Sequence, residues 1–126
     1  METIFILLVI FQIKHFIADY PLQFPYMYEN KGKRFGWILP LSDHAAVHGL
    51  FTLLILIGLS VFSVISTPVL LIAALGTMDY VTHFAIDRWK ATRGVGPDTS
   101  AFWMHLGIDQ MLHHLVGIII IYAVVS

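Results

Sequence analysis

Thirty consecutive residues, from Gly49 to Met78, contain no charged side chain. As one α-helix this run would be about 45 Å long, whereas the hydrocarbon core of a bilayer is about 30 Å thick. The run is therefore too long for a single crossing. We expect it to turn back between Ser63 and Pro68, because proline suits the first turn of a helix. The sequence thus predicts two membrane helices joined by a short uncharged turn.

Three further features extend this prediction to the whole chain. Hydrophobic residues make up 58% of the sequence and charged residues 12%, and the mean hydropathy is +0.81, which is too apolar for an ordinary soluble domain. Loop residues such as proline and glycine gather at about 20–40 and 90–99. We therefore expect an all-α fold: a single transmembrane domain over residues 1–126, built as an up-down-up-down four-helix bundle. The four expected membrane helices are about 3–19, 41–64, 67–89 and 100–125.

The distribution of basic residues predicts the orientation in the membrane. All seven are expected in or beside the two loops, and cytoplasmic loops collect lysine and arginine. The loops should then face the cytoplasm and both termini the outside of the inner membrane. The first helix is expected to be retained, because Glu2 precedes it instead of a basic segment and no small-residue cleavage site follows. The basic residues are Lys14, Lys31, Lys33, Arg34, Arg88, Lys90 and Arg93.

Histidine and aspartate recur at a spacing of four residues. Seven histidines and six aspartates among 126 residues would give about one such pair by chance, whereas six are present. Residues four apart share one face of a helix, one turn apart, a spacing at which two side chains can bind one metal ion. Every expected helix carries such a pair near the end that meets the basic loops. The pairs, one from each helix, are His15/Asp19, His44/His48, His83/Asp87 and Asp109/His113.

The positions along each helix predict two layers of ligands. His15, His48, His83 and His113 should form the deeper layer, and Asp19, His44, Asp87 and Asp109 a layer one turn nearer the basic loops. One turn deeper still, Gln12, Thr52 and Asp79 should orient the histidines. Eight nitrogen and oxygen donors suit two divalent transition-metal ions in a four-helix bundle. Without cysteine, zinc is favoured, with manganese or iron as alternatives.

Other polar residues receive simpler interpretations. His105 and His114 are expected to be surface or packing residues, and Asp43 to cap the second membrane helix. Lys31, Arg88 and Lys90 either steer and hold an anionic substrate or only follow the charge rule for cytoplasmic loops.

The polar strings of the chain resemble a catalogued family. The segments HFIADYPLQFPYMYENK, PLSDHAAVHGL, THFAIDRWK and DQMLHHL are similar to those of small prokaryotic and phage membrane proteins grouped as domain of unknown function 3307. The helical His-x-x-x-Asp pairs also resemble those of membrane-bound metal-dependent hydrolases and, more remotely, of the zinc-dependent phospholipase C and P1 nuclease group. Only His15/Asp19 and His83/Asp87 match that pattern directly. Asp109/His113 reverses it.

The expected activity is metal-dependent hydrolysis of a phosphoester at the cytoplasmic face. The metal ions would supply a hydroxide, and Asp19, Asp87 or Asp109 would bridge the ions or take the proton. The substrate class stays open between a lipid phosphate and a nucleotide; direct reading of nucleic acid is not expected, and an oligomer is possible. Two other classes remain: a metal-stabilised structural or partner-binding membrane protein, such as a phage factor acting on a host membrane complex, and a metal-ion or proton transporter.

Overall fold

The computed structural model describes residues 2–126, and this part of the chain forms five α-helices and no β-strand. The expected all-α class is therefore confirmed. Four long helices lie close to the predicted ranges, and a six-residue helix is present within the first expected loop. The helices are α1 Glu2–Asp19, α2 Pro25–Asn30, α3 Ile38–Val61, α4 Val69–Ala91 and α5 Ser100–Val125.

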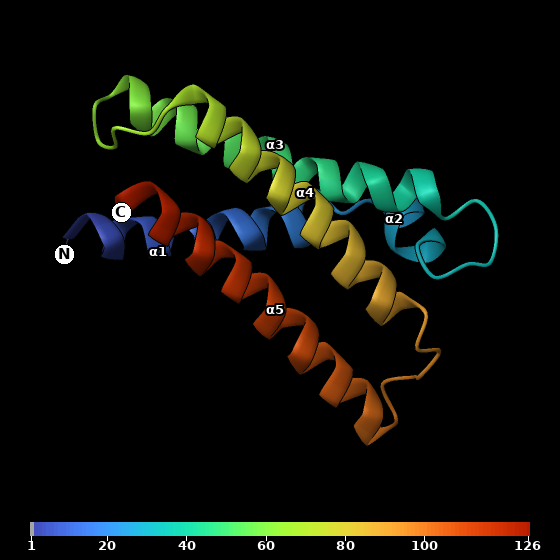
Figure 1. The fold of residues 1–126 in the computed structure, drawn as a ribbon. Helices are drawn as coiled ribbons and strands as arrows, with labels where there is room; N and C mark the ends of the chain where they lie inside the picture. Colours follow the sequence, from blue (N-terminus) through green and yellow to red (C-terminus); the bar gives the residue numbers. More distant parts are fainter. Residues whose placement is uncertain (1) are drawn as a thin grey trace.

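The four long helices alternate in direction along the chain (Figure 1). Helix α1 packs against α3 and α5, and α4 packs against the same two helices. Both chain ends and the α3–α4 turn meet at one end of the molecule, where residues 3–4, 64–66 and 124–126 line a common hollow. The ends of α1 and α4 and the starts of α3 and α5 consequently lie at the other end, together with α2.

Three helices, α3, α4 and α5, are long and apolar enough to cross a membrane. Helix α1 falls outside this group because Glu2, Lys14 and Asp19 are all among its 18 residues. Large apolar side chains cover the outside of the helices, as with Phe62, Val69 and Leu70, each more than 80% exposed. Such a surface is stable against lipid and unstable against water, which indicates a membrane protein.

The interior is divided along the helix axes into an apolar half and a polar half. The apolar half lies toward the chain termini and joins all four long helices. The polar half lies toward α2 and holds the buried histidines and aspartates. The apolar core consists of Leu7, Phe11, Leu56, Ile65, Ile72, Leu75, Ile120 and Ile121.

The uncharged turn between α3 and α4 reverses the chain, as the sequence predicts. Ser63 follows the C-cap with φ of 58°, and its N–H and that of Val64 donate to the carbonyls of Ser60 and Leu59 at 3.0 and 2.8 Å. These two bonds satisfy helix-terminal carbonyls in a Schellman motif. Pro68 then stands as the N-cap of α4. The predicted reversal between Ser63 and Pro68 is present.

Two local expectations are wrong. Asp43 does not cap a helix, because α3 begins at Ile38 and Asp43 lies inside it. Instead it accepts a hydrogen bond from the hydroxyl of Tyr26 on α2, which raises the pKa of that tyrosine. Lys14 is not beside a loop either. It lies within α1, is only 5% exposed, and therefore gives no information about orientation.

Candidate metal centre

The four histidines of the expected deeper layer lie together in the structure. Their ring centroids are 3.5 to 6.5 Å apart in all six pairings, although each comes from a different helix. The closest contacts are stacked: His48 on His83 at 3.5 Å and His83 on His113 at 4.0 Å. Such a stack of imidazoles in a membrane interior is costly unless their nitrogens have partners.

The outer layer consists of three carboxylates and His44, which lies between two of them. The Nε2 atom of His44 is 3.4 Å from Oδ1 of Asp19 and 3.3 Å from Oδ2 of Asp87. Asp19 also connects the layers, because its Oδ1 lies 2.9 Å from Nε2 of His48 and its Oδ2 lies 3.0 Å from Nε2 of His15. The structure thus brings all eight predicted ligands into one cluster. Six are buried, whereas His15 and Asp19 are more accessible.

Asp87 has a special place among the carboxylates, since its two oxygens face different helices. Its Oδ1 is 3.1 Å from Nε2 of His113 on α5, and its Oδ2 is 3.3 Å from Nε2 of His44 on α3. Asp109 adds an oxygen 3.5 Å from the same nitrogen of His113. A carboxylate with this arrangement can join two neighbouring binding positions.

The residues form three groups that could each hold a metal ion. Within each group, one ligand atom per residue can be chosen so that all atoms lie within 4.8 Å of one another. Two atoms bound to one zinc ion at ordinary bond lengths and a tetrahedral angle are about 3.4 Å apart. Three separations in the cluster, of 3.3 to 3.5 Å, are close to that value, whereas His48–Asp19 at 2.9 Å and His113–Asp87 at 3.1 Å are hydrogen bonds. The groups are His15/His48/His83, Asp19/His44/His48 and Asp87/Asp109/His113.

Polar atoms without a hydrogen-bond partner provide an independent test of whether the cluster suits a metal ion. Buried polar groups are normally hydrogen-bonded, yet several buried atoms of this cluster have no hydrogen-bond partner. A divalent cation would satisfy unpaired nitrogens such as Nδ1 of His48 and Nε2 of His83, two residues of one of the three groups. The donor set therefore fits a metal. The atoms are His15 Nε2, His44 Nδ1, His48 Nδ1, His83 Nε2, His113 Nδ1 and Asp109 Oδ1.

The deepest polar residues include one that the sequence interpretation missed. Nζ of Lys14 and Oγ1 of Thr52 both donate to Oδ2 of Asp79 at 2.5 Å. Oδ1 of Asp79 is 3.0 Å from Nδ1 of His83, so Asp79 orients that ring and directs Nε2 toward the cluster. Thr52 and Asp79 thus lie where expected. Lys14 was missed because its partner Asp79 is 65 residues away in the sequence, on another helix.

Gln12 and His114 make a contact of their own. Gln12 Nε2 donates to Nδ1 of His114 at 3.1 Å across α1 and α5. The expected role of Gln12, orientation of a deeper-layer histidine, is not seen, because its amide is bonded to His114. His114 also lies against the cluster, with its ring centroid 5.3 Å from that of His15. His105 packs edge-on against Trp89 at 5.6 Å, as a packing residue would.

The three basic residues expected to bind substrate divide into two kinds. Lys31 donates to Oδ2 of Asp87 at 2.8 Å, and Lys90 donates to Oδ2 of Asp109 at 2.6 Å. Arg88 instead donates to the carbonyl of Lys31 at 2.7 Å and stacks on Trp37 at 3.7 Å. The two lysines therefore touch the cluster, whereas Arg88 fastens the loop after α2 to α4.

The fold and the cluster define a class: a small all-helical membrane protein with a buried centre of histidine and aspartate. A protein-family model matches residues 6–126, which is nearly the whole chain. The chain therefore belongs to that family, which is described as Protein of unknown function (DUF3307). The expected family membership is thereby confirmed. Among the curated proteins and among the solved structures, nothing matches the chain.

Proposed function

We propose that the protein is a membrane-embedded, metal-dependent hydrolase of a phosphoester, with a dinuclear centre at the cytoplasmic face of the inner membrane. The observation that carries this proposal is the divided environment of Asp87, which faces a histidine of α3 with one oxygen and a histidine of α5 with the other. Bridging carboxylates of this kind hold two metal ions together in helical bundles.

The ligands divide into two sets on either side of Asp87. One ion, with zinc favoured over manganese or iron, would be held by Asp19, His44 and His48. The other would be held by Asp109 and His113, together with Asp87. His15 and His83 stand beside the first set and can complete the coordination. Nε2 of His83 has no hydrogen-bond partner, and Nε2 of His15 lies 3.0 Å from Oδ2 of Asp19.

The reaction is the attack of water on phosphorus. Bound metal ions supply a hydroxide near neutral pH and neutralise charge on the phosphoryl oxygens. The water oxygen forms the new bond to phosphorus, the ester P–O bond breaks, and the leaving alkoxide takes up a proton. Asp109 is placed to accept the proton of the water, because its buried Oδ1 makes no hydrogen bond and Nε2 of His113 is 3.5 Å away from it. Lys31 and Lys90 are placed to hold the phosphate, while Arg88 keeps its structural contacts.

The proposal includes α1 as a fourth membrane helix. Its three charges do not oppose this placement, because Lys14 is neutralised inside the molecule by Asp79, and Glu2 and Asp19 lie at the helix ends. The alternating helix directions then put both termini outside and the basic loops, α2 and the metal centre in the cytoplasm.

A structural role is the second candidate, and one observation favours it. Three carboxylates of the polar core already have lysine partners. The pairs are Asp79 with Lys14, Asp87 with Lys31, and Asp109 with Lys90. Such ion pairs can maintain a fold without catalysis. Transport is less well supported, because the apolar core closes the other half of the molecule.

Purified protein tests both candidates. Metal content and hydrolysis of a generic phosphomonoester and phosphodiester should be measured for the parent chain and for His48→Ala. A hydrolase shows metal-dependent turnover that His48→Ala abolishes. A structural centre shows bound metal with no turnover on any ester, and that result would contradict the proposed activity.

A further inference from the structure

A polar pair lies on the outer surface of the helices at a depth where lipid is expected. Gln12 is exposed and His114 is partly exposed, and the two are hydrogen-bonded across the seam between α1 and α5. His114 stands near the middle of α5, a helix long and apolar enough to cross a membrane. Polar groups that face lipid within a membrane span are rare and indicate contact with something polar.

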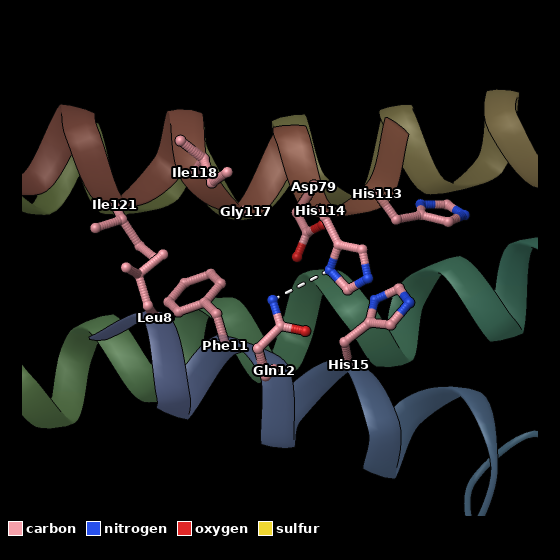
Figure 2. Close-up of a pocket in the computed structure, with 10 residues that line it drawn as sticks. All are labelled: Leu8, Phe11, Gln12, His15, Asp79, His113, His114, Gly117, Ile118 and Ile121. Atoms are coloured by element: carbon pink, nitrogen blue, oxygen red, sulfur yellow. Dashed lines mark hydrogen bonds between the residues drawn. The ribbon is translucent and has the colours of Figure 1, made fainter. Parts of the chain in front are cut away.

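Behind this pair, a narrow cavity leads to the metal centre (Figure 2). Figure 2 shows its two ends: apolar side chains such as Leu8 and Ile118 on one side, and His15, His113 and His114 on the other. The ring of His114 is 5.3 Å from that of His15, which in turn is 5.4 Å from His113, so the polar path is continuous. The free space is about 20 Å³, enough for one water molecule.

The aqueous approach to the centre, beside α2, is only partly covered, because the side chains of Asp19 and Lys90 remain 17% and 26% exposed. Helix α2 packs on α3 with Met27 only 4% exposed, and the residue that follows α2, Lys31, bonds to Asp87. Arg88 holds this loop in place through the carbonyl of Lys31. Of the two approaches, the seam between α1 and α5 is the one that opens toward lipid.

We propose that the seam admits the head group of a phosphate-bearing lipid from the leaflet next to the basic loops, an inference that rests on the proposed function. The polar end of the seam lies toward the basic loops and its apolar end toward the chain termini. This is the orientation of a lipid in that leaflet. The phosphate displaces the bond between Gln12 and His114 and contacts both. The acyl chain lies outside the cavity, along Leu8 and Ile118.

Photo-crosslinking tests this site without relying on turnover. The protein in bilayer nanodiscs is exposed to phosphatidic acid with a photoreactive acyl chain, or to diacylglycerol with the same chain and no phosphate, and labelled peptides are mapped. We expect peptides with Leu8 or Ile118 to be labelled about threefold more, or better, by phosphatidic acid, a ratio typical of one added hydrogen bond. Gln12→Leu and His114→Leu should remove the preference. Equal labelling of these peptides by the two lipids overturns the proposal.

Thr77→Val is the matched control. Thr77 is likewise an exposed polar residue on a membrane helix, but it lies on α4 and bonds to its own helix at the carbonyl of Ala73. The control variant should keep the preference for phosphatidic acid. Metal content should be unchanged in all three variants, since none of these residues belongs to the ligand groups. A loss of preference in Thr77→Val would show a general effect on packing and would also overturn the proposal.

Hydrolysis separates this inference from the function on which it rests. Gln12→Leu should lower release of phosphate from phosphatidic acid about tenfold more than it lowers hydrolysis of water-soluble p-nitrophenyl phosphate, because only the lipid needs the seam. Equal losses on both substrates contradict the lipid route while the hydrolase remains. Head-group-dependent labelling with no turnover on either substrate supports the lipid site and contradicts the hydrolase.

Discussion

At the scale of single residues, Asp79 shows how a membrane interior can hold a charge. Its carboxylate receives Lys14, Thr52 and His83, and neither Lys14 nor Asp79 is more than 5% exposed. Removing one member of a buried ion pair leaves an uncompensated charge, which costs much more than the pair contributes.

Asp79→Leu should therefore destabilise the protein by about 3–5 kcal/mol, because Lys14 loses its partner. The double variant Lys14→Met/Asp79→Leu should recover most of that loss, since no charge is left unpaired. Chemical unfolding in detergent, followed by circular dichroism, measures both. If the double variant is as unstable as the sum of the two single variants, the two residues do not act as a pair.

Lys31 tests the relation between the lysines and the metal. Its ammonium occupies Oδ2 of Asp87, so Lys31 and a bridging cation compete for the same oxygen. Lys31→Met should lower the stability of the metal-free protein by about 1 kcal/mol and increase the stabilisation that zinc provides. Lys33→Met is the control, because the side chain of the exposed Lys33 donates to the amide oxygen of Asn30 and not to a carboxylate. Equal zinc-induced shifts in melting temperature for both variants would contradict the competition.

At the scale of elements, α3 and α4 form the tightest helix pair through small residues. A Cβ atom at Gly49 would lie 2.9 Å from the carbonyl oxygen of Gly76 and 3.0 Å from Cβ of Tyr80. The helices can approach this closely only because glycine is present, as is common between membrane helices. His48 is the neighbour of Gly49, so this approach also fixes a ligand of the cluster.

Gly49→Ala should lower the free energy of unfolding by about 1–3 kcal/mol, because the added methyl group pushes α3 and α4 apart. Gly58→Ala is the matched control on the same helix, since a Cβ there meets nothing within 4 Å. It should be neutral or stabilise by about 0.5–1 kcal/mol. Thermal unfolding of the two variants and the parent protein measures these changes in stability. A Gly49→Ala protein as stable as the parent would contradict the close packing.

Most of the elements could be predicted from the sequence, and the exceptions have physical causes. Long apolar runs fix the existence of α3, α4 and α5, and the spacing of four residues fixes which faces meet. Helix α2 was missed because six residues with Pro25 and polar neighbours carry no hydrophobic period. The start of α3 was placed three residues late, since Pro40 lies in its first turn and was interpreted as a loop residue.

The cluster shows what sequence periodicity can and cannot predict. The pairs predicted that eight side chains converge, because alternating helices bring equivalent ends together. The sequence did not show which carboxylate faces two helices, nor that Lys14, Lys31 and Lys90 pair with aspartates, because those contacts depend on rotation and distance between helices. The bond between Gln12 and His114 was unpredictable for the same reason.

At the scale of the whole molecule, the division into an apolar half and a polar half fixes where chemistry can occur. The apolar core near the termini offers no polar path, whereas the end with α2 holds the buried donors and the loop lysines. The orientation in the membrane therefore decides which compartment the centre faces.

We predict that both termini face outward. The chain has no cysteine, so Ser126→Cys and Lys33→Cys each introduce a single thiol. On intact cells an impermeant thiol reagent should label Ser126→Cys and leave Lys33→Cys unlabelled, because basic loops stay in the cytoplasm. Labelling with the opposite pattern would reverse the orientation and place the centre on the outer face.

The number of metal ions in the purified protein tests the dinuclear centre most directly. Elemental analysis in detergent should give close to two transition-metal ions per parent chain, with zinc predominant. Asp87→Ala, which removes the carboxylate shared by both sets of ligands, should contain markedly less metal and should unfold more easily. A reproducible content below about 0.3 ions per chain in metal-replete parent protein, or full metal and unchanged stability in Asp87→Ala, would contradict the dinuclear centre.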